Sequence, residues 1–304
     1  MGTSSFGVPS LKILLKKGEN IIGVFTQPDR PQGRGLKIKM SPIKELVLEN
    51  HLPCFQPEKI NRDESVNIIK RLSPDLIVVA AFGQIISQRI LDIPRFGCIN
   101  VHASLLPKYR GAAPINWVII QGEKETGVTT MLMDKGLDTG NILLQKKIEI
   151  FPEENAGKLH DRLSFLGAEV LLETVERLKQ GGLTTYKQEE SEASYAPTLK
   201  KEHGLIDWGK SAEKIYNHIR GMNPWPGAFT YLDGKILKVF QAKLVRSESP
   251  STPGKVEKTS DEGILVGAGE CHVLLTEIQL ENHKRMPAAL FLRGHPLLIG
   301  THLG

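Results

Sequence analysis

An amide and an imidazole stand two residues apart at Asn100 and His102, at the end of the apolar run 98–102. Alternation along an extended strand places both side chains on one face. The amide N–H can hold a developing oxyanion, and the imidazole can move a proton near neutral pH, so the pair suits acyl chemistry. A single histidine is more often a satisfied core residue. The loop 104–111, rich in turn formers and with no obvious role in a core, favours the catalytic interpretation.

Asp138 is the third candidate, and it lies between two glycines in the run 136–140. An Asp in such a setting is about as often a simple turn residue. If it instead faces His102, it would orient the ring and stabilise the imidazolium. Ser104 has no base of its own besides His102, so the sequence indicates direct attack rather than a covalent intermediate.

Metal and nucleotide chemistry have little support in the sequence. Cys98 and His102 could bind a metal, but the other ligands of a tetrahedral set are missing nearby. The three cysteines, Cys54, Cys98 and Cys271, show no CxxC spacing, so neither a structural zinc site nor a disulfide framework is expected. No GxGxxG or GxxxxGK[ST] run occurs, so a dinucleotide or P-loop site is not predicted.

The elements that would position these residues are short apolar runs alternating with amphipathic stretches. Strands are expected at 21–25, 76–81, 98–102 and 127–133, and helices at 43–49, 64–72 and 156–180. Strands that are apolar on both faces, with helices between them, predict an α/β fold with a Rossmann-like, doubly wound, mostly parallel sheet. Ligands of such sheets bind beyond the carboxyl ends of the strands, where Asn100 and His102 lie.

The pattern changes beyond residue 205 to short strands between Gly, Pro and Asp turns. Strands are expected at 228–232, 236–240, 255–258, 263–266 and 272–278, after a helix over 211–222 capped by Ser211. Such spacing predicts a small antiparallel, OB-like β-barrel. A chain of 304 residues suits two domains. We therefore expect a catalytic domain over 1–183, a linker over 184–204 and a barrel over 205–304.

Positive charge gathers in one segment of a chain whose net charge is +5. Residues 27–44 hold one acid, Asp29, and five bases: Arg30, Arg34, Lys37, Lys39 and Lys44. Interspersed Pro and Gly exclude a regular helix, so the segment is expected to be a mobile basic loop of about 15 residues, a length that is uncommon without a function. A solvated loop is the simpler interpretation, and a polyanionic partner is the alternative.

Three motifs together carry a resemblance to a known family. The run 100–115, Asn-Val-His-Ala-Ser-Leu-Leu-Pro-Lys-Tyr-Arg-Gly-Ala-Ala-Pro-Ile, followed by Asp138 in Leu-Asp-Thr-Gly, resembles the signature of formyltransferases that use 10-formyltetrahydrofolate. Residues 26–35 resemble the segment by which tRNA-modifying members of that family reach their tRNA. Residues 223–227, Asn-Pro-Trp-Pro-Gly, are similar to a motif of the family's second domain. The resemblance covers nearly the whole chain.

The resemblance implies transfer of a formyl group from 10-formyltetrahydrofolate to the α-amino group of methionine on initiator tRNA. It implies that Asn100 and His102 stabilise a tetrahedral oxyanion and that Asp138 holds His102 for proton transfer. The implied folate contacts are Ser104, Leu105, Leu106 and Pro107, with Phe82, Gly83 and Gln84 lining the pterin pocket. The implied tRNA contacts are Arg34, Arg30 and Lys37. Folate would be the formyl-donor substrate, and no metal is implied.

Two alternatives stay open at this point. Another formyl-folate enzyme, such as a 10-formyltetrahydrofolate hydrolase domain or a sugar-nucleotide formyltransferase, would share the three catalytic residues but would not need the basic segment. A non-catalytic RNA-binding protein would use the charge but leave Asn100, His102 and Asp138 without a function.

We expect a monomer that does not enter a membrane, because the longest apolar run, 76–82, is too short to span one. The expected location is a bacterial cytoplasm, or an organellar matrix if a transit peptide has been removed.

One departure from the family pattern concerns the amino terminus. Members of the family have an apolar strand just before Gly-Thr, whereas Met1 directly precedes Gly2 and Thr3 here. We therefore expect the first strand of the sheet to be missing, through truncation or a start at an internal methionine.

Overall fold

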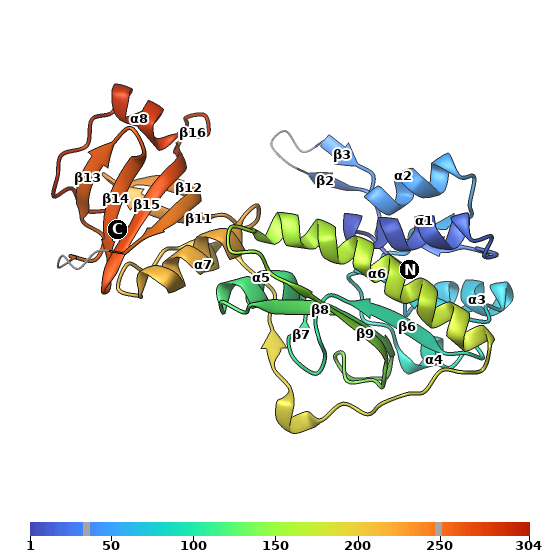
Figure 1. Cartoon of the computed structure of the whole chain (residues 1–304). Coiled ribbons are helices and arrows are strands. Elements are labelled where there is room, and N and C mark those ends of the chain that lie inside the picture. Colours follow the sequence, from blue (N-terminus) through green and yellow to red (C-terminus); the bar gives the residue numbers. More distant parts are fainter. Residues whose placement is uncertain (33–36, 247–250) are drawn as a thin grey trace. The chain divides into compact units, whose positions relative to one another are not determined.

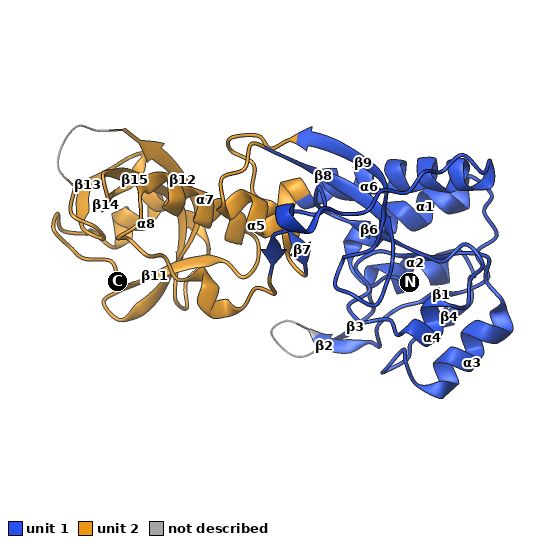
Figure 2. Ribbon diagram, turned by 90° about the horizontal axis from the view of Figure 1, so that it is seen from below, with its two compact units in different colours: residues 1–111, 125–148, 160–196 blue, residues 112–124, 149–159, 197–304 orange. Residues whose placement is uncertain are grey.

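The computed structural model in Figure 1 describes residues 1–32, 37–246 and 251–304. The chain forms two compact units, coloured separately in Figure 2. Unit 1 contains residues 1–111, 125–148 and 160–196, and unit 2 contains residues 112–124, 149–159 and 197–304. The segment expected to be a linker, 184–204, is therefore divided: residues 184–196 belong to unit 1, and the rest belongs to unit 2.

Unit 1 is built on two sets of paired strands. The first set is β1 (Val24–Phe25) beside β4 (Cys54–Phe55), which run parallel. The second has the order β5-β6-β8-β9, with bounds Ile77–Val79, Cys98–His102, Glu125–Leu132 and Ile142–Glu149. Strands β5 and β6 are parallel, and β6 and β8 are antiparallel. The expected α/β sheet is confirmed, although the run 21–25 forms a strand only over its last two residues.

Three helices lie at the positions expected from the sequence: α2 (Pro42–Glu49), α3 (Asp63–Leu72) and α6 (Ala156–Lys179). Two more, α1 (Val8–Lys16) and α4 (Gln88–Leu91), were not expected. Helix α2 begins at Pro42, and the Ser41 hydroxyl accepts the Lys44 N–H at 3.1 Å. Helix α3 buries Val66 and Ile69 and ends at Ser73 in the left-handed conformation. Figures 1 and 2 show α6 running alongside α1.

The two sets of strands meet at the amino terminus. The Gly2 N–H donates to the Phe25 carbonyl at 3.0 Å, and the Met1 carbonyl accepts from the Ala80 N–H at 3.0 Å. The Met1 ammonium donates to the Val78 carbonyl at 2.6 Å. Residues Met1 and Gly2 therefore lie between β1 and β5, bonded to both.

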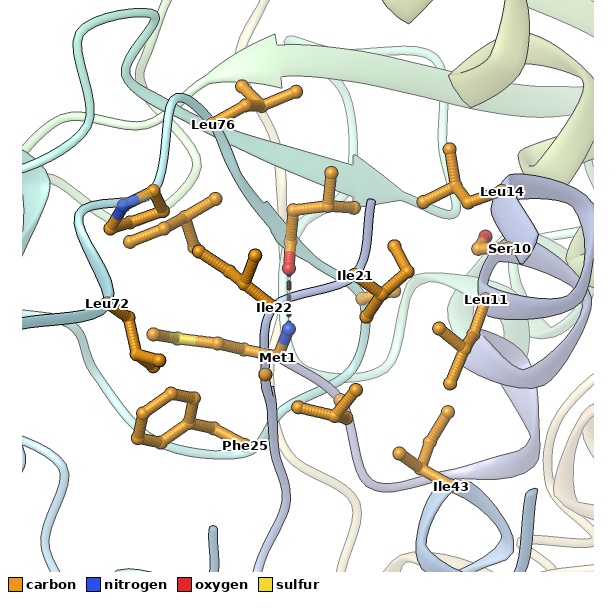
Figure 3. Close-up of a pocket in the computed structure, with 18 of the residues that line it drawn as sticks. Met1, Ser10, Leu11, Leu14, Ile21, Ile22, Phe25, Ile43, Leu72 and Leu76 are labelled. Carbon is orange, nitrogen blue, oxygen red and sulfur yellow. Dashed lines mark hydrogen bonds between the residues drawn. The ribbon is translucent and has the colours of Figure 1, made fainter. Parts of the chain in front are cut away.

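An apolar cavity of about 150 Å³ lies beside Met1 in this gap (Figure 3). Ile21, Ile22, Leu72 and Leu76 are among the side chains that line it. Desolvation by the surrounding side chains lowers the pKa of the Met1 amine from 8.0 to about 6. An amine with that pKa is largely neutral at pH 7.

The basic segment is not the extended loop that the sequence predicted. Residues Arg30–Gln32 form β2 and residues Lys37–Lys39 form β3, which pair antiparallel as a hairpin before α2 begins. The prolines and glycines exclude a helix, as expected, but Pro31 is compatible with an edge strand that needs no N–H from that residue. The expectation of a loop was wrong for the described part of this segment.

Unit 2 contains the expected small antiparallel β domain. Its strands are β11 (Ala228–Leu232), β12 (Lys235–Val245), β13 (Val256–Ser260), β14 (Gly263–Ala268), β15 (Cys271–Leu280) and β16 (Met286–Pro287). The order is β11-β12-β15-β14-β13, with β16 added beside β15. Its helices are α5 (Pro114–Ile120), α7 (Ala212–Met222) and α8 (Ala288–Gly294). Ile215 and Ile219 of α7 belong to one buried core with Val239 and Leu275 of the sheet.

Candidate active site

Asn100, His102 and Asp138 come together in unit 1 around one carboxylate. Asn100 and His102 alternate on β6 as expected, and the Asn100 amide donates to Asp138 Oδ1 at 3.2 Å. His102 Nδ1 lies 3.6 Å from Asp138 Oδ2, which also accepts the Gly111 N–H at 2.8 Å. The His102 and Asp138 side chains are only 6% and 12% exposed, which keeps their electrostatic interaction strong. The three groups named from the sequence thus form one cluster, and their catalytic roles stay a prediction.

The second ring nitrogen of His102 determines where this histidine carries hydrogen. Nε2 lies 2.9 Å from the Tyr109 carbonyl oxygen. A carbonyl oxygen can only accept, so Nε2 carries the hydrogen in the neutral ring. Nδ1 is then the nitrogen that takes up a proton, next to the Asp138 carboxylate. A protonated His102 would have an acceptor at each nitrogen.

Two residues of the cluster hold an uncommon backbone conformation. Asp138 has φ +54° and Tyr109 has φ +60°, both in the left-handed region. Residues other than glycine in this region cost energy and persist where the surrounding structure fixes them. Both residues present the atoms that contact His102, so the strain is located where the site needs a fixed geometry.

A short parallel pairing fixes the loop that follows His102. Strand β7 (Arg110–Gly111) pairs with β10 (Tyr195–Ala196). Gly111 has φ +113°, and a Cβ on it would lie 2.8 Å from the Ala196 carbonyl oxygen, so only glycine fits there. The Gly111 N–H thereby faces Asp138. The segment expected to be a linker is thus part of the structure that supports the site.

A buried pair of polar side chains, which sequence reasoning missed, connects that segment to Asp138. The Gln188 amide donates to the carbonyls of Asp138 and Gly140 at 2.8 and 2.7 Å. Its Oε1 accepts from Arg110 Nε at 3.0 Å. Arg110 belongs to the quoted signature but received no role, and nothing in the polar stretch around Gln188 marks that residue in the sequence.

Comparison with known proteins places this arrangement in a family. Residues 1–175 match the formyl transferase family, and residues 198–296 match the formyl transferase C-terminal domain. The chain belongs to the formyl transferase family. It is 53% identical to the methionyl-tRNA formyltransferase of Geobacter sulfurreducens, covering 100% of this chain and 95% of that protein. The methionyl-tRNA formyltransferase of Caldanaerobacter subterraneus is 52% identical, with 100% and 98% covered.

Solved structures support the fold at low sequence identity. WlaRD, a sugar 3N-formyl transferase crystallised with dTDP and 5-N-formyl-THF, has a TM-score of 0.69 at 21% identity, covering 93% of this chain and 97% of that one. HypX from Aquifex aeolicus in complex with tetrahydrofolic acid has a TM-score of 0.60 at 20% identity, covering 81% of this chain and 43% of that one. The formyl transferase fold predicted from the sequence is confirmed.

The residues predicted to contact folate in this formyl transferase lie on two loops of unit 1. Ser104 and Leu106 are buried, whereas Leu105 and Pro107 are half-buried. The Ser104 hydroxyl donates to the Lys108 carbonyl at 2.6 Å, and this bond stabilises the loop between the two residues. Its role toward folate stays a prediction, as do those of its neighbours.

The loop predicted to line the pterin pocket follows β5. Phe82 is buried in one apolar core with Val79 and Ile86, and Gly83 is exposed with φ +82°. The Gln84 side chain accepts from the Ile60 N–H at 2.7 Å and donates to the Pro57 carbonyl at 3.1 Å. These bonds give Gln84 a structural task at this loop, and pterin contact stays a prediction.

The residues predicted to contact tRNA lie on the β2–β3 hairpin. Arg30 is exposed and forms an ion pair of 3.6 Å with Glu58. Lys37 opens β3 opposite Gln32, and Arg34 lies outside the described residues. Asp29, the one acid of this segment, bonds to Lys44, which lowers the pKa of its carboxyl. Lys44 is therefore tied within the protein, whereas Arg30 presents its charge to solvent.

The described residues offer little support for metal binding or for catalysis by a thiol. No group of three or more His, Cys, Asp or Glu side chains suited to a metal is found in residues 1–32, 37–246 and 251–304. Cys98 lies at the start of β6, and desolvation raises the pKa of its thiol to about 12. A thiol of that pKa is protonated at neutral pH and is a poor nucleophile.

Within residues 1–32, 37–246 and 251–304, no helix combines the length and the apolar character that crossing a bilayer needs.

Proposed function

We propose that this chain transfers the formyl group of 10-formyltetrahydrofolate to the α-amino group of methionyl initiator tRNA. The observation that carries the proposal is the convergence of Asn100 and His102 on the Asp138 carboxylate. The relatives at 52–53% identity over the whole chain, which are named methionyl-tRNA formyltransferases, support the choice of substrate.

The proposed reaction is a direct attack by the amine on the formyl carbon. A bond forms between the methionine nitrogen and that carbon, and the carbonyl oxygen becomes an oxyanion. The Asn100 amide has two N–H groups, of which one donates to Asp138, so the other can donate to the oxyanion. The bond from the formyl carbon to the folate nitrogen then breaks, and the electron pair of the oxyanion re-forms the carbonyl.

His102 would carry the proton between the two nitrogens. The attacking amine loses a proton to His102 Nδ1, and the departing folate nitrogen receives it. While the proton is on the ring, Asp138 stabilises the imidazolium from 3.6 Å, and the Tyr109 carbonyl accepts from the other nitrogen. No covalent enzyme intermediate is needed in this scheme.

The hairpin β2–β3 would supply contacts to the phosphates of tRNA. Arg30 and Lys39 face each other across the hairpin, and both are exposed. Such contacts position a nucleic acid and give salt-dependent affinity. We propose that the chain acts as a monomer in the compartment where charged tRNA is made, the cytoplasm in a bacterium.

An assay of formyl transfer tests this proposal. The chain is supplied with 10-formyltetrahydrofolate and, separately, with methionyl initiator tRNA, uncharged tRNA, free methionine and an amino-sugar nucleotide. Formyl transfer to methionyl-tRNA alone, with affinity that falls steeply as salt rises, would support it. Transfer to the sugar nucleotide, or hydrolysis of the folate with no acceptor, would replace it with one of the other formyl-folate reactions.

A further inference from the structure

We infer that Gln188 and Arg110 are positioning residues that hold Asp138 in its working conformation. This inference rests on the proposed function, because it assumes that Asp138 acts on His102. It also assigns a task to the segment 184–196, which the sequence presented as a linker.

The contacts of Gln188 are aimed at the backbone of the turn that carries Asp138. Its amide nitrogen donates to the carbonyls of both Asp138 and Gly140, and all three residues lie in unit 1. Gln188 is 6% exposed, so these bonds form away from water and are costly to leave unmade. The two bonds fix the orientation of the peptide units that follow Asp138 and Gly140.

Asp138 needs such support because its backbone is in the left-handed region. With φ +54° the residue would relax to a commoner conformation if the turn were free. Relaxation would swing the carboxylate away from the Gly111 N–H at 2.8 Å and from His102 Nδ1 at 3.6 Å. The bonds from the Gln188 amide therefore oppose the backbone change that would separate Asp138 from Gly111 and His102.

Arg110 in turn fixes the orientation of the Gln188 amide. Because Arg110 Nε can only donate, it binds the oxygen of that amide and leaves the nitrogen to face the two carbonyls. The guanidinium is 1% exposed, and its Nη1 binds both oxygens of Glu190 at 3.0 and 2.9 Å. Glu190 is largely exposed, so it neutralises the charge from the solvent side.

The energetics of Arg110 favour a positioning role over a stabilising one. A guanidinium that is fully buried needs excellent geometry to recover its desolvation cost. Arg110 Nη2 is buried and has no hydrogen-bond partner among the described residues. An apolar side chain of similar length would fill the same space without that cost. We therefore assign the buried charge of Arg110 the task of orienting the Gln188 amide.

The test compares three variants that remove different parts of this arrangement. Gln188→Ala removes the bonds to both the turn and Arg110. Gln188→Glu retains an acceptor for Arg110 but places a carboxylate oxygen against the two carbonyls. Arg110→Met keeps the volume and removes the group that orients the amide. Glu189→Gln is the matched control, because Glu189 is exposed on the same segment and accepts from the Ser191 hydroxyl.

We expect kcat for formyl transfer to fall about 10- to 100-fold in the first three variants, as misplacement of a catalytic group by about an ångström does, while KM for the folate changes less than threefold. Arg110→Met leaves Gln188 Oε1 without its donor, so its melting temperature should fall by a few degrees, and kcat is compared for the folded protein. Glu189→Gln should match the parent in both respects.

A second measurement is made on the protein without substrates, so it does not depend on the proposed reaction. The Gly111 amide, which donates to Asp138 Oδ2, is followed by hydrogen exchange or by its NMR shift. In Gln188→Ala its protection should drop at least tenfold, while the amides of Ile99 and Val101 in β6 stay protected. An unchanged Gly111 amide, or kcat within twofold of the parent in all three variants, would overturn the inference. Failure of the parent chain to formylate methionyl-tRNA, with the Gly111 effect intact, would instead overturn only the proposed function.

Discussion

Among the residues that the structure describes, His102 and His272 are both buried, and each faces a partly buried carboxylate. The two pairs differ in what surrounds the carboxylate. His102 and Asp138 lie 3.6 Å apart in unit 1, and the carboxylate is shared with Asn100 and Gly111. His272 and Glu257 in unit 2 form a tight ion pair in which one ring nitrogen contacts the carboxylate directly. In the first pair the two groups are not in hydrogen-bond contact, and the carboxylate also accepts from two other donors. The second is closed.

The backbone explains the difference. His272 is on β15 and Glu257 is on β13, with β14 between them. A register shift at Glu257 lets its carboxylate reach across β14, where Gly267 lacks the Cβ that would lie 2.8 Å from Glu257 Oε1. Asp138 instead lies on a turn held from outside by Gln188. The paired strands hold Glu257 directly against His272. The turn holds Asp138 where it contacts several groups at once.

The largest expected effect is on catalysis by the first pair. Replacing His102 or Asp138 with Ala should lower kcat for formyl transfer by about 10²–10⁴-fold, because the proton carrier or its counter-charge is lost. Folate binding, measured by titration, should survive. Unchanged turnover in either variant would remove that residue from the mechanism and make the two pairs equivalent.

The second pair should respond in stability and not in turnover. His272→Ala leaves the Glu257 carboxylate without its partner, so the free energy of unfolding should fall by about 3 kcal/mol, the low end for a broken buried pair. Urea unfolding measures the loss, and kcat of the folded fraction should stay near the parent value. If His272→Ala lowers kcat as His102→Ala does, the contrast between the two pairs is wrong.

The Met1 amine is a third titratable group to compare, since it bonds to the Val78 carbonyl and not to a carboxylate among the described residues. Its pKa in the folded chain is about 6, against 8.0 when exposed, so the unfolded state binds more protons between these values. Stability should therefore rise from pH 6 to pH 8, by about 2–3 kcal/mol at 1.36 kcal/mol per unit. Urea unfolding of the chain numbered from Met1 measures this slope.

The control for that slope is a chain extended ahead of Met1 by about five apolar residues. The extension removes the amine from the gap and brings apolar side chains to the cavity in Figure 3. We expect the extended chain to unfold at higher urea and to lose the Met1 contribution to the slope. His218, whose pKa is lowered by burial, contributes to the slope in both chains and cancels in the difference.

The smallest expected effect concerns the exposed charges of the hairpin. Arg30→Ala should weaken tRNA binding a few-fold and reduce the slope of log affinity against log salt by about one, as the loss of one phosphate contact does. Lys70→Ala, an exposed base on α3, is the matched control and should leave the slope unchanged. Equal effects of the two changes would show that net charge alone, and not the hairpin, attracts the tRNA.

What the sequence determined by itself is local. The alternation in the run 98–102 predicted β6 with its observed bounds and placed Asn100 and His102 on one face. The cap at Ser211 and the spacing behind it predicted α7 within one residue. These features depend on neighbours along the chain, so their pattern is visible in the order of residues. The motif, rather than the periodicity, connected Asp138 to them across 38 positions.

Only the tertiary structure decided which distant segments support the site. Gln188 lies in a polar stretch without periodicity, and it reaches Asp138 only because β7 and β10 pair across more than 80 residues. The hairpin β2–β3 likewise depends on cross-strand pairing, which a run of Pro, Gly and basic residues does not predict. Hydrogen bonds between segments far apart in the chain produce no regular spacing in the sequence. A polar side chain could bond to many different groups, and only the fold decides which one lies beside it.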